Sequence, residues 1–298
     1  MVRQYKIHTN LDGTDDKVWD VTNGKVRFYQ PSNLGLQSTN NIWQSDGIGV
    51  MGTRSITQPQ IEFKLETFGE SLEENYRLMK DFVNDILNKK FVTLEYQTEI
   101  FQVYADLALA DVTKTEGYGK NGTFSEKITF DIITKWYTYE NLTFDMIKNG
   151  KVIAGKSKIY GGTAPGNYKY VKGTSYTYYG ETNIERLSRW DIKDEIFSFM
   201  GILYPQLPKT PAGVRFLDDI GNEYTAIVFK TEQVQNYILI NTDVNDEIYQ
   251  GWNGTTSLNL FPVMDFERYR TRIIKKGQME LINLTKAEFK VKRKADFI

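Results

Sequence analysis

Alternation of apolar and charged residues is the feature of this sequence that most limits how the chain can fold. The segment from Ile61 to Glu66 alternates strictly, which predicts a β-strand with one buried face and one solvent-facing face. Similar patterns run through 91–96, 101–112 and 123–134, and clusters of Gly, Asn and Asp separate them as turns do. The first part of the chain is therefore predicted to be mainly β.

The same strand pattern returns in the last third of the chain. The predicted strands there are 196–204, 212–218, 223–230, 236–241, 257–261, 278–283 and 287–292. Many short strands at nearly regular spacing are typical of a sandwich or barrel. No internal repeat of solenoid length is visible.

One helix is predicted among these strands. Ser71 and Glu74 have the spacing of a capping box, and apolar residues then recur at helical spacing through Asn88. The apolar positions are Leu72, Tyr76, Met79, Phe82, Val83, Ile86 and Leu87. Packing against the sheet is favoured over the alternative of a partner-binding helix, because buried strands flank the helix on both sides.

The composition argues for a protein that works by contact and not by catalysis. There is no Cys, which excludes disulfides, thiolate metal sites and thiol nucleophiles, and there is one His, which excludes sites that need two imidazoles. That residue, His8, ends an N-terminal strand pattern, where a structural or surface role is expected. By contrast, 41 residues are aromatic. We expect no enzyme activity, no catalytic residue and no cofactor.

Three motifs suggest ligand sites but have simpler explanations. Gly117 to Gly122 matches G-x-G-x-x-G, yet strand patterns flank it on both sides and Asn121-Gly122 favours a hairpin turn over a dinucleotide loop. The acidic runs 12–16 and 243–247 lack the spacing of a calcium loop. Acidic turns of this density are common, so no metal site is predicted. A carboxylate pair for glycoside cleavage is not selected by any sequence feature.

Charge and hydropathy give further expectations. Residues 1–134 carry 14 basic and 19 acidic side chains, whereas 265–298 carry 10 basic and 5 acidic ones. In this basic tail the charged residues alternate with apolar ones, which indicates the solvent-facing side of a strand and not a nucleic-acid site. The N-terminus lacks the pattern of a signal peptide, and the longest uncharged apolar run, 196–208, is too short for a membrane span.

The segment from Lys148 to Gly180 has a different composition, rich in Gly, Lys, Ser, Thr and Tyr and poor in aliphatic residues. It cannot bury much apolar surface alone, so loops and thin hairpins are expected, and a short helix is a candidate for 185–195. Tyr is enriched at interfaces, which makes this segment a candidate docking surface. A solvated insertion whose rings pack on one another is the alternative. The candidate partner-binding residues are Tyr168, Tyr170, Tyr176, Tyr178, Tyr179, Arg186, Arg189 and Trp190.

Several stretches together resemble the distal tail proteins of siphophage baseplates, in the form found in lactococcal siphophages. In the first half they are 31–36, 45–49, 54–56 and 61–66, followed by the capped helix. In the second half they are 238–243, 259–261, Gly277 and 289–291. The motifs are diffuse turn and strand signatures, and the order in which they occur over nearly the whole chain carries the resemblance.

The resemblance implies a virion protein made in the host cytoplasm and located at the tail tip. Family members form a ring of six copies that joins the tail-tube protein to the tail-associated fibre-base protein, and DNA passes through the ring without specific binding. No membrane contact is implied. The N-terminal domain builds the ring, and the C-terminal domain is galectin-like. In lactococcal members an arm ending in a hand extends from it and holds the receptor-binding proteins.

The predicted architecture is therefore mainly β and has two domains. Residues 1–135 form a β-sandwich-like ring domain with one α-helix, and 136–298 form a galectin-like sandwich with an inserted extension at about 145–195. The predicted function is a structural hub. A carbohydrate-binding module with Tyr and Trp rings as platforms is the alternative, because galectin-like shape alone does not determine sugar binding. A cell-wall glycosidase is a third hypothesis.

Overall fold

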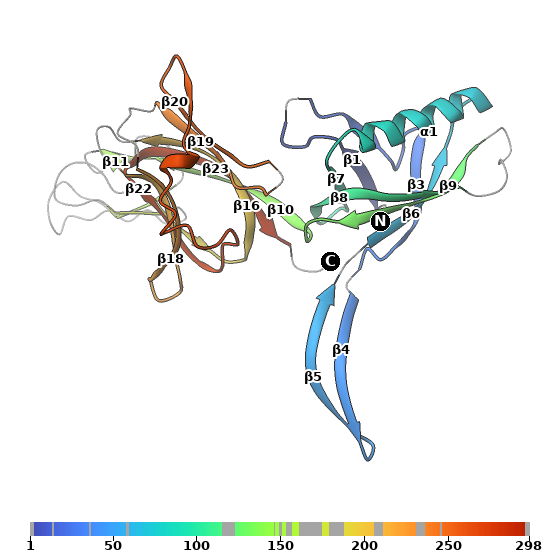
Figure 1. The fold of residues 1–298 in the computed structure, drawn as a ribbon, viewed down its shortest axis with the longest axis horizontal. Coiled ribbons are helices and arrows are strands. Elements are labelled where there is room, and N and C mark those ends of the chain that lie inside the picture. The colour runs from blue at the N-terminus through green and yellow to red at the C-terminus, as the bar shows by residue number, and fades with distance from the viewer. Residues whose placement is uncertain are drawn as a thin grey trace. The chain divides into compact units, whose positions relative to one another are not determined.

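A computed structural model of the chain shows a mainly β protein with one α-helix, and its strands and helix are drawn in Figure 1. Contacts between residues divide it into two compact units, which are described separately. Unit 1 is 1–138 together with 295–298, and unit 2 is 139–294. The described residues are 3–13, 15–35, 37–57, 60–114, 123–145, 147–148, 151–152, 157–160, 175–178, 188–205, 211–230, 236–244 and 246–295.

Unit 1 is built on one curved antiparallel sheet. In spatial order its strands are β2 (Val18–Asp20), β1 (Gln4–His8), β7 (Val92–Gln97), β8 (Gln102–Thr113), β9 (Ser125–Ile132), β6 (Gln60–Thr67) and β3 (Val26–Ser32). The alternation that predicted the strand at 61–66 is confirmed: Ile61, Phe63 and Leu65 are fully buried. The charged residues between them form ion pairs on the other face, such as Lys127 with Glu62.

Helix α1 (Leu72–Leu87) covers the apolar face of this sheet. The predicted cap is confirmed, because the Ser71 hydroxyl accepts a hydrogen bond from the Glu74 N–H. Phe82 and Ile86 are buried, as core packing requires. The predicted apolar face is partly wrong, however. Asn75 is fully buried because its amide bonds both backbone groups of Gly69, whereas Leu72, Tyr76 and Leu87 are exposed.

Unit 2 is a sandwich of two sheets around a second core. One sheet has the order β10 (Tyr137–Asp145), β23 (Leu284–Lys294), β16 (Ile196–Pro205), β19 (Tyr237–Asn241), β20 (Ile248–Trp252) and β21 (Ser257–Asn259). The other has the order β13 (Ser157–Tyr160), β14 (Ser175–Tyr178), β15 (Ser188–Ile192), β22 (Gly277–Ile282), β17 (Ala212–Leu217) and β18 (Glu223–Phe229). Phe199 on β16 packs between Phe216 on β17 and Phe289 on β23, so the two sheets share one core.

The strands predicted for the last third of the chain are confirmed with small shifts of their ends. The short helix at 185–195 is wrong, because residues 188–192 form β15, which pairs along its length with β22. Trp190 and Ile192 pack on the core of unit 2, and this pairing overrides the charged composition of the segment. β20 was not predicted. Short β11 (Ile147–Lys148) and β12 (Lys151–Val152) pair antiparallel, and a 3-10 turn, η2, covers Phe261–Val263.

No helix among the described residues is both long and apolar enough to cross a membrane.

Candidate functional site

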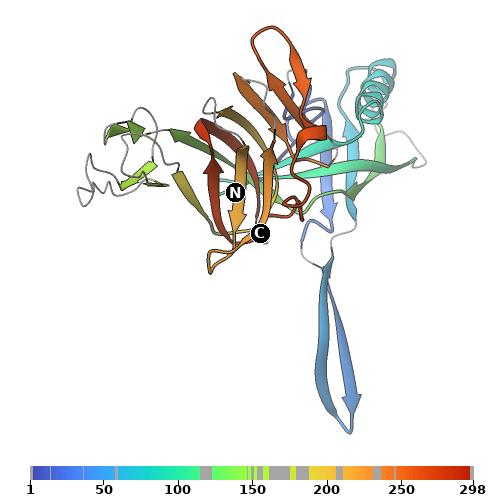
Figure 2. The ribbon, with the colours of Figure 1, turned by 60° about the vertical axis from the view of Figure 1, so that its left-hand side comes forward.

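The hairpin of β4 (Gln37–Ser45) and β5 (Ile48–Thr57) carries a group of exposed apolar side chains in unit 1. It forms a sheet of its own and projects from the rest of unit 1 as a narrow ribbon (Figures 1 and 2). The turn is Asp46-Gly47, and both residues have positive φ, 50° and 81°. That combination identifies the tight two-residue turn whose twist matches paired strands. Turns had been predicted at clusters of Gly, Asn and Asp, of which Asp46-Gly47 is one, but the two long strands had not been predicted.

The tip half of this hairpin carries large apolar side chains on both faces. Trp43 pairs with Val50, and Ile48 follows on the same face, whereas Ile42 pairs with Met51 on the opposite face. Trp43 is 70% exposed and Ile48 is also 70% exposed. A two-stranded hairpin is at best marginally stable alone in water, and an exposed apolar ribbon is a site for pairing with another surface. The exposed apolar side chains of this hairpin are therefore a candidate surface for contact with another protein.

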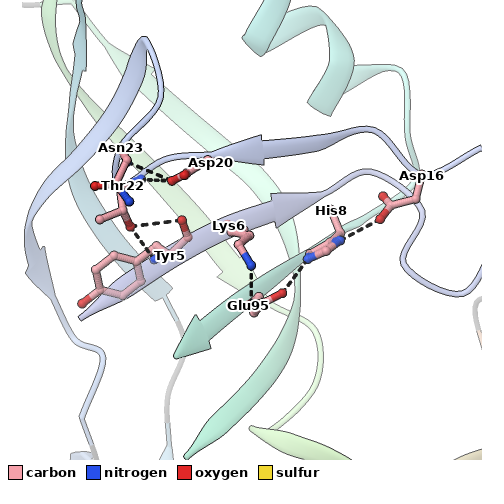
Figure 3. Close-up of polar contacts among 8 residues, drawn as sticks. All are labelled: Tyr5, Lys6, His8, Asp16, Asp20, Thr22, Asn23 and Glu95. Carbon is pink, nitrogen blue, oxygen red and sulfur yellow. Dashed lines mark hydrogen bonds and ion pairs between the residues drawn. The ribbon is translucent and has the colours of Figure 1, made fainter. Parts of the chain in front are cut away.

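The lone histidine lies in a buried polar cluster on the sheet of unit 1, which Figure 3 shows. His8 ends β1 and is 8% exposed. Its Nδ1 lies 2.6 Å from Asp16 Oδ2 and its Nε2 lies 2.9 Å from Glu95 Oε2 on β7. Lys6 Nζ reaches the other oxygen of Glu95 at 2.9 Å. The cluster thus ties β1, β7 and the loop around Asp16 together.

The polar partners of Glu95 compensate for its burial in this cluster. Burial raises the pKa of Glu95, but hydrogen bonds from Lys6 and His8 outweigh burial, so the pKa of Glu95 lies below its ordinary value. Lys6 Nζ donates to one oxygen of Glu95, and the two His8 ring nitrogens lie within hydrogen-bond distance of Asp16 and of the other Glu95 oxygen. Every polar group of the His8 ring is occupied by protein, which fits the structural role predicted for it.

A second buried carboxylate lies on the neighbouring strand. Asp106 on β8 is fully buried and accepts hydrogen bonds from the Thr93 hydroxyl at 2.8 Å and the Tyr137 hydroxyl at 2.7 Å. Tyr137 opens β10, so this bond fixes the start of β10 against the sheet. A buried carboxylate is stable when protein hydrogen bonds replace the ones that it would make to water. For Asp106, the Thr93 and Tyr137 hydroxyls donate these hydrogen bonds.

The predicted docking residues fall mostly outside the described part of the chain. Tyr168, Tyr170, Tyr179 and Arg186 lie outside the described residues. Tyr176 and Tyr178 are on β14, and Arg189 on β15 is the register partner of Tyr176. Trp190 is half-buried against the core of unit 2, so packing accounts for part of its surface.

The motifs set aside earlier remain without support. Gly117 to Gly122 lies outside the described residues, but the flanking strands β8 and β9 pair antiparallel, as a hairpin requires. Among the residues that the structure describes, no group of three Asp, Glu or His side chains is arranged to hold a metal ion. Within the second acidic run, the Asp243 carboxylate pairs with buried Lys292 Nζ at 2.9 Å.

These observations define a class first. The chain has two mainly β units, its buried carboxylates are bonded to neighbouring side chains, and its β4–β5 hairpin exposes apolar residues. These properties are typical of a protein that assembles with others through its surface. Comparison with known families gives the particular family. The model of the distal tail protein N-terminal domain matches 4–133, and that of the Dit C-terminal domain matches 135–298. The chain belongs to the distal tail protein family, as its sequence motifs had suggested.

Relatives of high identity support the same assignment. The distal tail proteins of Lactococcus phages p2 and SK1 are 93% and 92% identical over 298 residues, which is 100% of each chain. A solved structure of the phage p2 baseplate in its activated conformation with calcium contains a chain of 93% identity that matches with full coverage of both chains and a TM-score of 0.79. The SPP1 Dit protein has a similar fold at 12% identity and a TM-score of 0.52, with 98% of this chain and 99% of that chain covered. The chain is thus a structural protein of the siphophage virion, located in the baseplate at the tail tip. These findings do not favour the carbohydrate-binding alternative.

Proposed function

We propose that the chain forms a ring of six copies that joins the tail tube to the baseplate and holds receptor-binding proteins, and that it does so without catalysis. The observation that carries the self-assembly is the β4–β5 hairpin. Its five large apolar side chains are each between 49% and 70% exposed, and no other segment within the described part of unit 1 covers them. A closed ring uses two different complementary patches on each subunit, and a projecting hairpin is suited to be one of them.

Solution mass tests the ring directly. Native mass spectrometry or sedimentation of the purified chain is expected to show a species of six copies, and negative-stain images are expected to show a ring. A chain that stays monomeric across the accessible concentration range would contradict the proposal.

The docking of receptor-binding proteins is assigned to the extension at about 145–195, with the Tyr, Arg and Trp residues named above as its contacts. Removing the extension is the test, and unit 2 limits how much can be removed. β15 pairs with β22, and Ile192 on β15 is buried in the core, so a deletion must end before Ser188. A deletion of 149–187 is expected to keep the ring and to abolish co-purification with the receptor-binding protein. Retained co-purification would show that the contacts lie elsewhere.

Passage of DNA through the ring fits the charge of the first domain. The net charge over 1–134 is −5, and repulsion from phosphate would keep DNA from adhering to the ring. Duplex DNA is expected to show no binding to the purified ring at physiological salt. Binding that weakens steeply with added salt, the behaviour of a basic surface, would contradict this part of the proposal.

A further inference from the structure

The loop between β20 and β21 contains an Asn-Gly pair, Asn253-Gly254, whose hydrogen bonds favour a chemical modification of the Asn side chain. The chain has four Asn-Gly pairs, and two of them lie outside the described residues. The structure describes the other two, Asn253-Gly254 and Asn23-Gly24. They differ in the contacts of the two groups that would react, the Asn side-chain amide and the Gly backbone nitrogen.

The side-chain carbonyl of Asn253 is surrounded by hydrogen-bond donors. Its Oδ1 accepts hydrogen bonds from the backbone N–H of Thr255 at 3.1 Å and from that of Thr256 at 2.9 Å. The hydroxyls of the same two residues also donate to Oδ1, at 3.1 and 3.2 Å. Donors that are in place before a reaction begins stabilise the negative charge that develops on a carbonyl oxygen. The Asn253 Cγ atom is therefore activated toward attack by a nucleophile.

The backbone nitrogen of Gly254 is the nucleophile that the chain supplies next to this carbon. None of the residues that the structure describes accepts a hydrogen bond from the Gly254 N–H. Gly254 has a φ of 97°, which a Gly adopts without strain, and it has no side chain to obstruct the approach of its nitrogen to Cγ. Asn253 and Gly254 are both exposed, so water and hydroxide reach the pair.

The Asn23-Gly24 pair has the opposite arrangement and serves as a comparison within the same chain. The Gly24 N–H donates a hydrogen bond to the Asp20 carbonyl oxygen at 3.0 Å, so this nitrogen is held in its turn. Within the described part of the chain, no donor reaches the side-chain oxygen of Asn23. Asn23 is exposed, as Asn253 is, so the two Asn side chains differ in their bonding and not in their access to water.

We propose that Asn253 is a site of spontaneous deamidation in the folded chain. Hydroxide removes the Gly254 amide proton, and the nitrogen then attacks Asn253 Cγ and forms an N–C bond. The negative charge passes to Oδ1, where the Thr255 and Thr256 donors stabilise it. The bond from Cγ to the side-chain nitrogen breaks, and this nitrogen takes a proton from water and leaves as ammonia. Water then opens the succinimide ring at either carbonyl, so one water is consumed and one ammonia is released.

The two products of ring opening have different consequences for the β20–β21 hairpin. An Asp at 253 keeps the length of the main chain, and its carboxylate can accept the same four hydrogen bonds. An isoaspartate adds a carbon to the main chain between Trp252 and Ser257, which are register partners at the ends of the two strands. The loop therefore accommodates the Asp product and is distorted by the isoaspartate product. This inference is independent of the proposed ring.

Peptide mapping by mass spectrometry tests the proposal on the purified chain after incubation in mildly alkaline buffer. The mass gain from replacing an amide by a carboxyl group is followed at Asn253 and Asn23 in the same sample. In the folded chain Asn253 is expected to react roughly tenfold faster than Asn23. In concentrated urea the two rates are expected to converge, because unfolding removes the Thr donors from Asn253 and the Asp20 contact from Gly24. Equal rates in the folded chain, or a difference that persists in urea, would overturn the proposal.

A variant of the loop tests the activation of Oδ1. Thr255→Val with Thr256→Val removes the two hydroxyl donors and keeps the side-chain shape. It is expected to slow the reaction at Asn253 and to leave the rate at Asn23 unchanged, whereas an unchanged rate at Asn253 would refute the activation of its carbonyl. The comparison with urea uses the unmodified chain, so it remains decisive even if the double variant does not fold.

Asn253→Asp reproduces the product that keeps the main-chain length. The melting temperature of this variant is expected to match that of the unmodified chain, because the carboxylate retains the loop donors. A clearly lower melting temperature would contradict the accommodation of the Asp product.

Discussion

Substituting Trp43 by Ser separates assembly from folding, because the side chain is exposed in the single chain. Trp43 is 70% exposed in the single chain, so its loss should change the free energy of unfolding by no more than about 0.5 kcal/mol. If a neighbouring copy covers the indole, about 140 Å² of apolar surface is removed from water, which is worth about 3 kcal/mol at about 25 cal/mol per Å². That free energy corresponds to a loss of affinity of roughly 100-fold at each interface.

The assay is dilution of purified protein followed by mass photometry, with thermal unfolding measured on the same samples. Trp43→Ser is expected to dissociate at far higher concentration than the unmodified chain while its melting temperature stays within about 2 °C. Ile220→Ser is the matched control, since it removes another exposed apolar side chain and should leave both quantities unchanged. An unchanged dissociation midpoint for Trp43→Ser would refute the assignment of the hairpin as an interface.

Three further predictions concern the stability of the two units and are checked by chemical or thermal unfolding. Phe82→Ala should cost about 3–4 kcal/mol because Phe82 is fully buried, whereas Leu87→Ala on the same helix should cost less than about 0.5 kcal/mol. Glu95→Gln should cost about 1–3 kcal/mol at pH 7, because it removes the buried carboxylate charge that pairs with Lys6 Nζ at 2.9 Å. The lowered pKa of Glu95 means that its contribution is complete above its unfolded pKa near 4.5 and is lost as the pH falls through the folded value, so the penalty should shrink in acid. Gly277→Ala should cost about 2 kcal/mol, since the added Cβ would meet the Leu217 carbonyl oxygen, a backbone atom that cannot move aside.

Local patterns predicted those elements whose stability depends on one buried face. The strand at 61–66 and the cap at Ser71 were predictable because alternation and capping are properties of neighbouring residues. The hairpin strands were missed because β4 has no buried face within its own chain, so its sequence shows no alternation. Its turn at Asp46-Gly47 was the single local signal.

Features that depend on distant residues could not be predicted from the sequence. His8 and Glu95 are 87 positions apart, and nothing near His8 indicates a carboxylate on both sides of its ring. Likewise, the sequence pattern does not show that Asn75 is buried and hydrogen bonded to Gly69 while Leu72 and Tyr76 are exposed. A sequence pattern predicts reliably that a helix is amphipathic. It predicts less reliably which side of the helix packs against the core.

The measurement that tests the account most directly is the mass of the purified chain in solution as a function of concentration. The account predicts a discrete species of six 34.6 kDa chains that dissociates on dilution, and that dissociates earlier when Trp43 is replaced. A monomer at every concentration, or a six-chain species indifferent to Trp43, would contradict the claim that this protein is a ring-forming hub held together by its exposed hairpin.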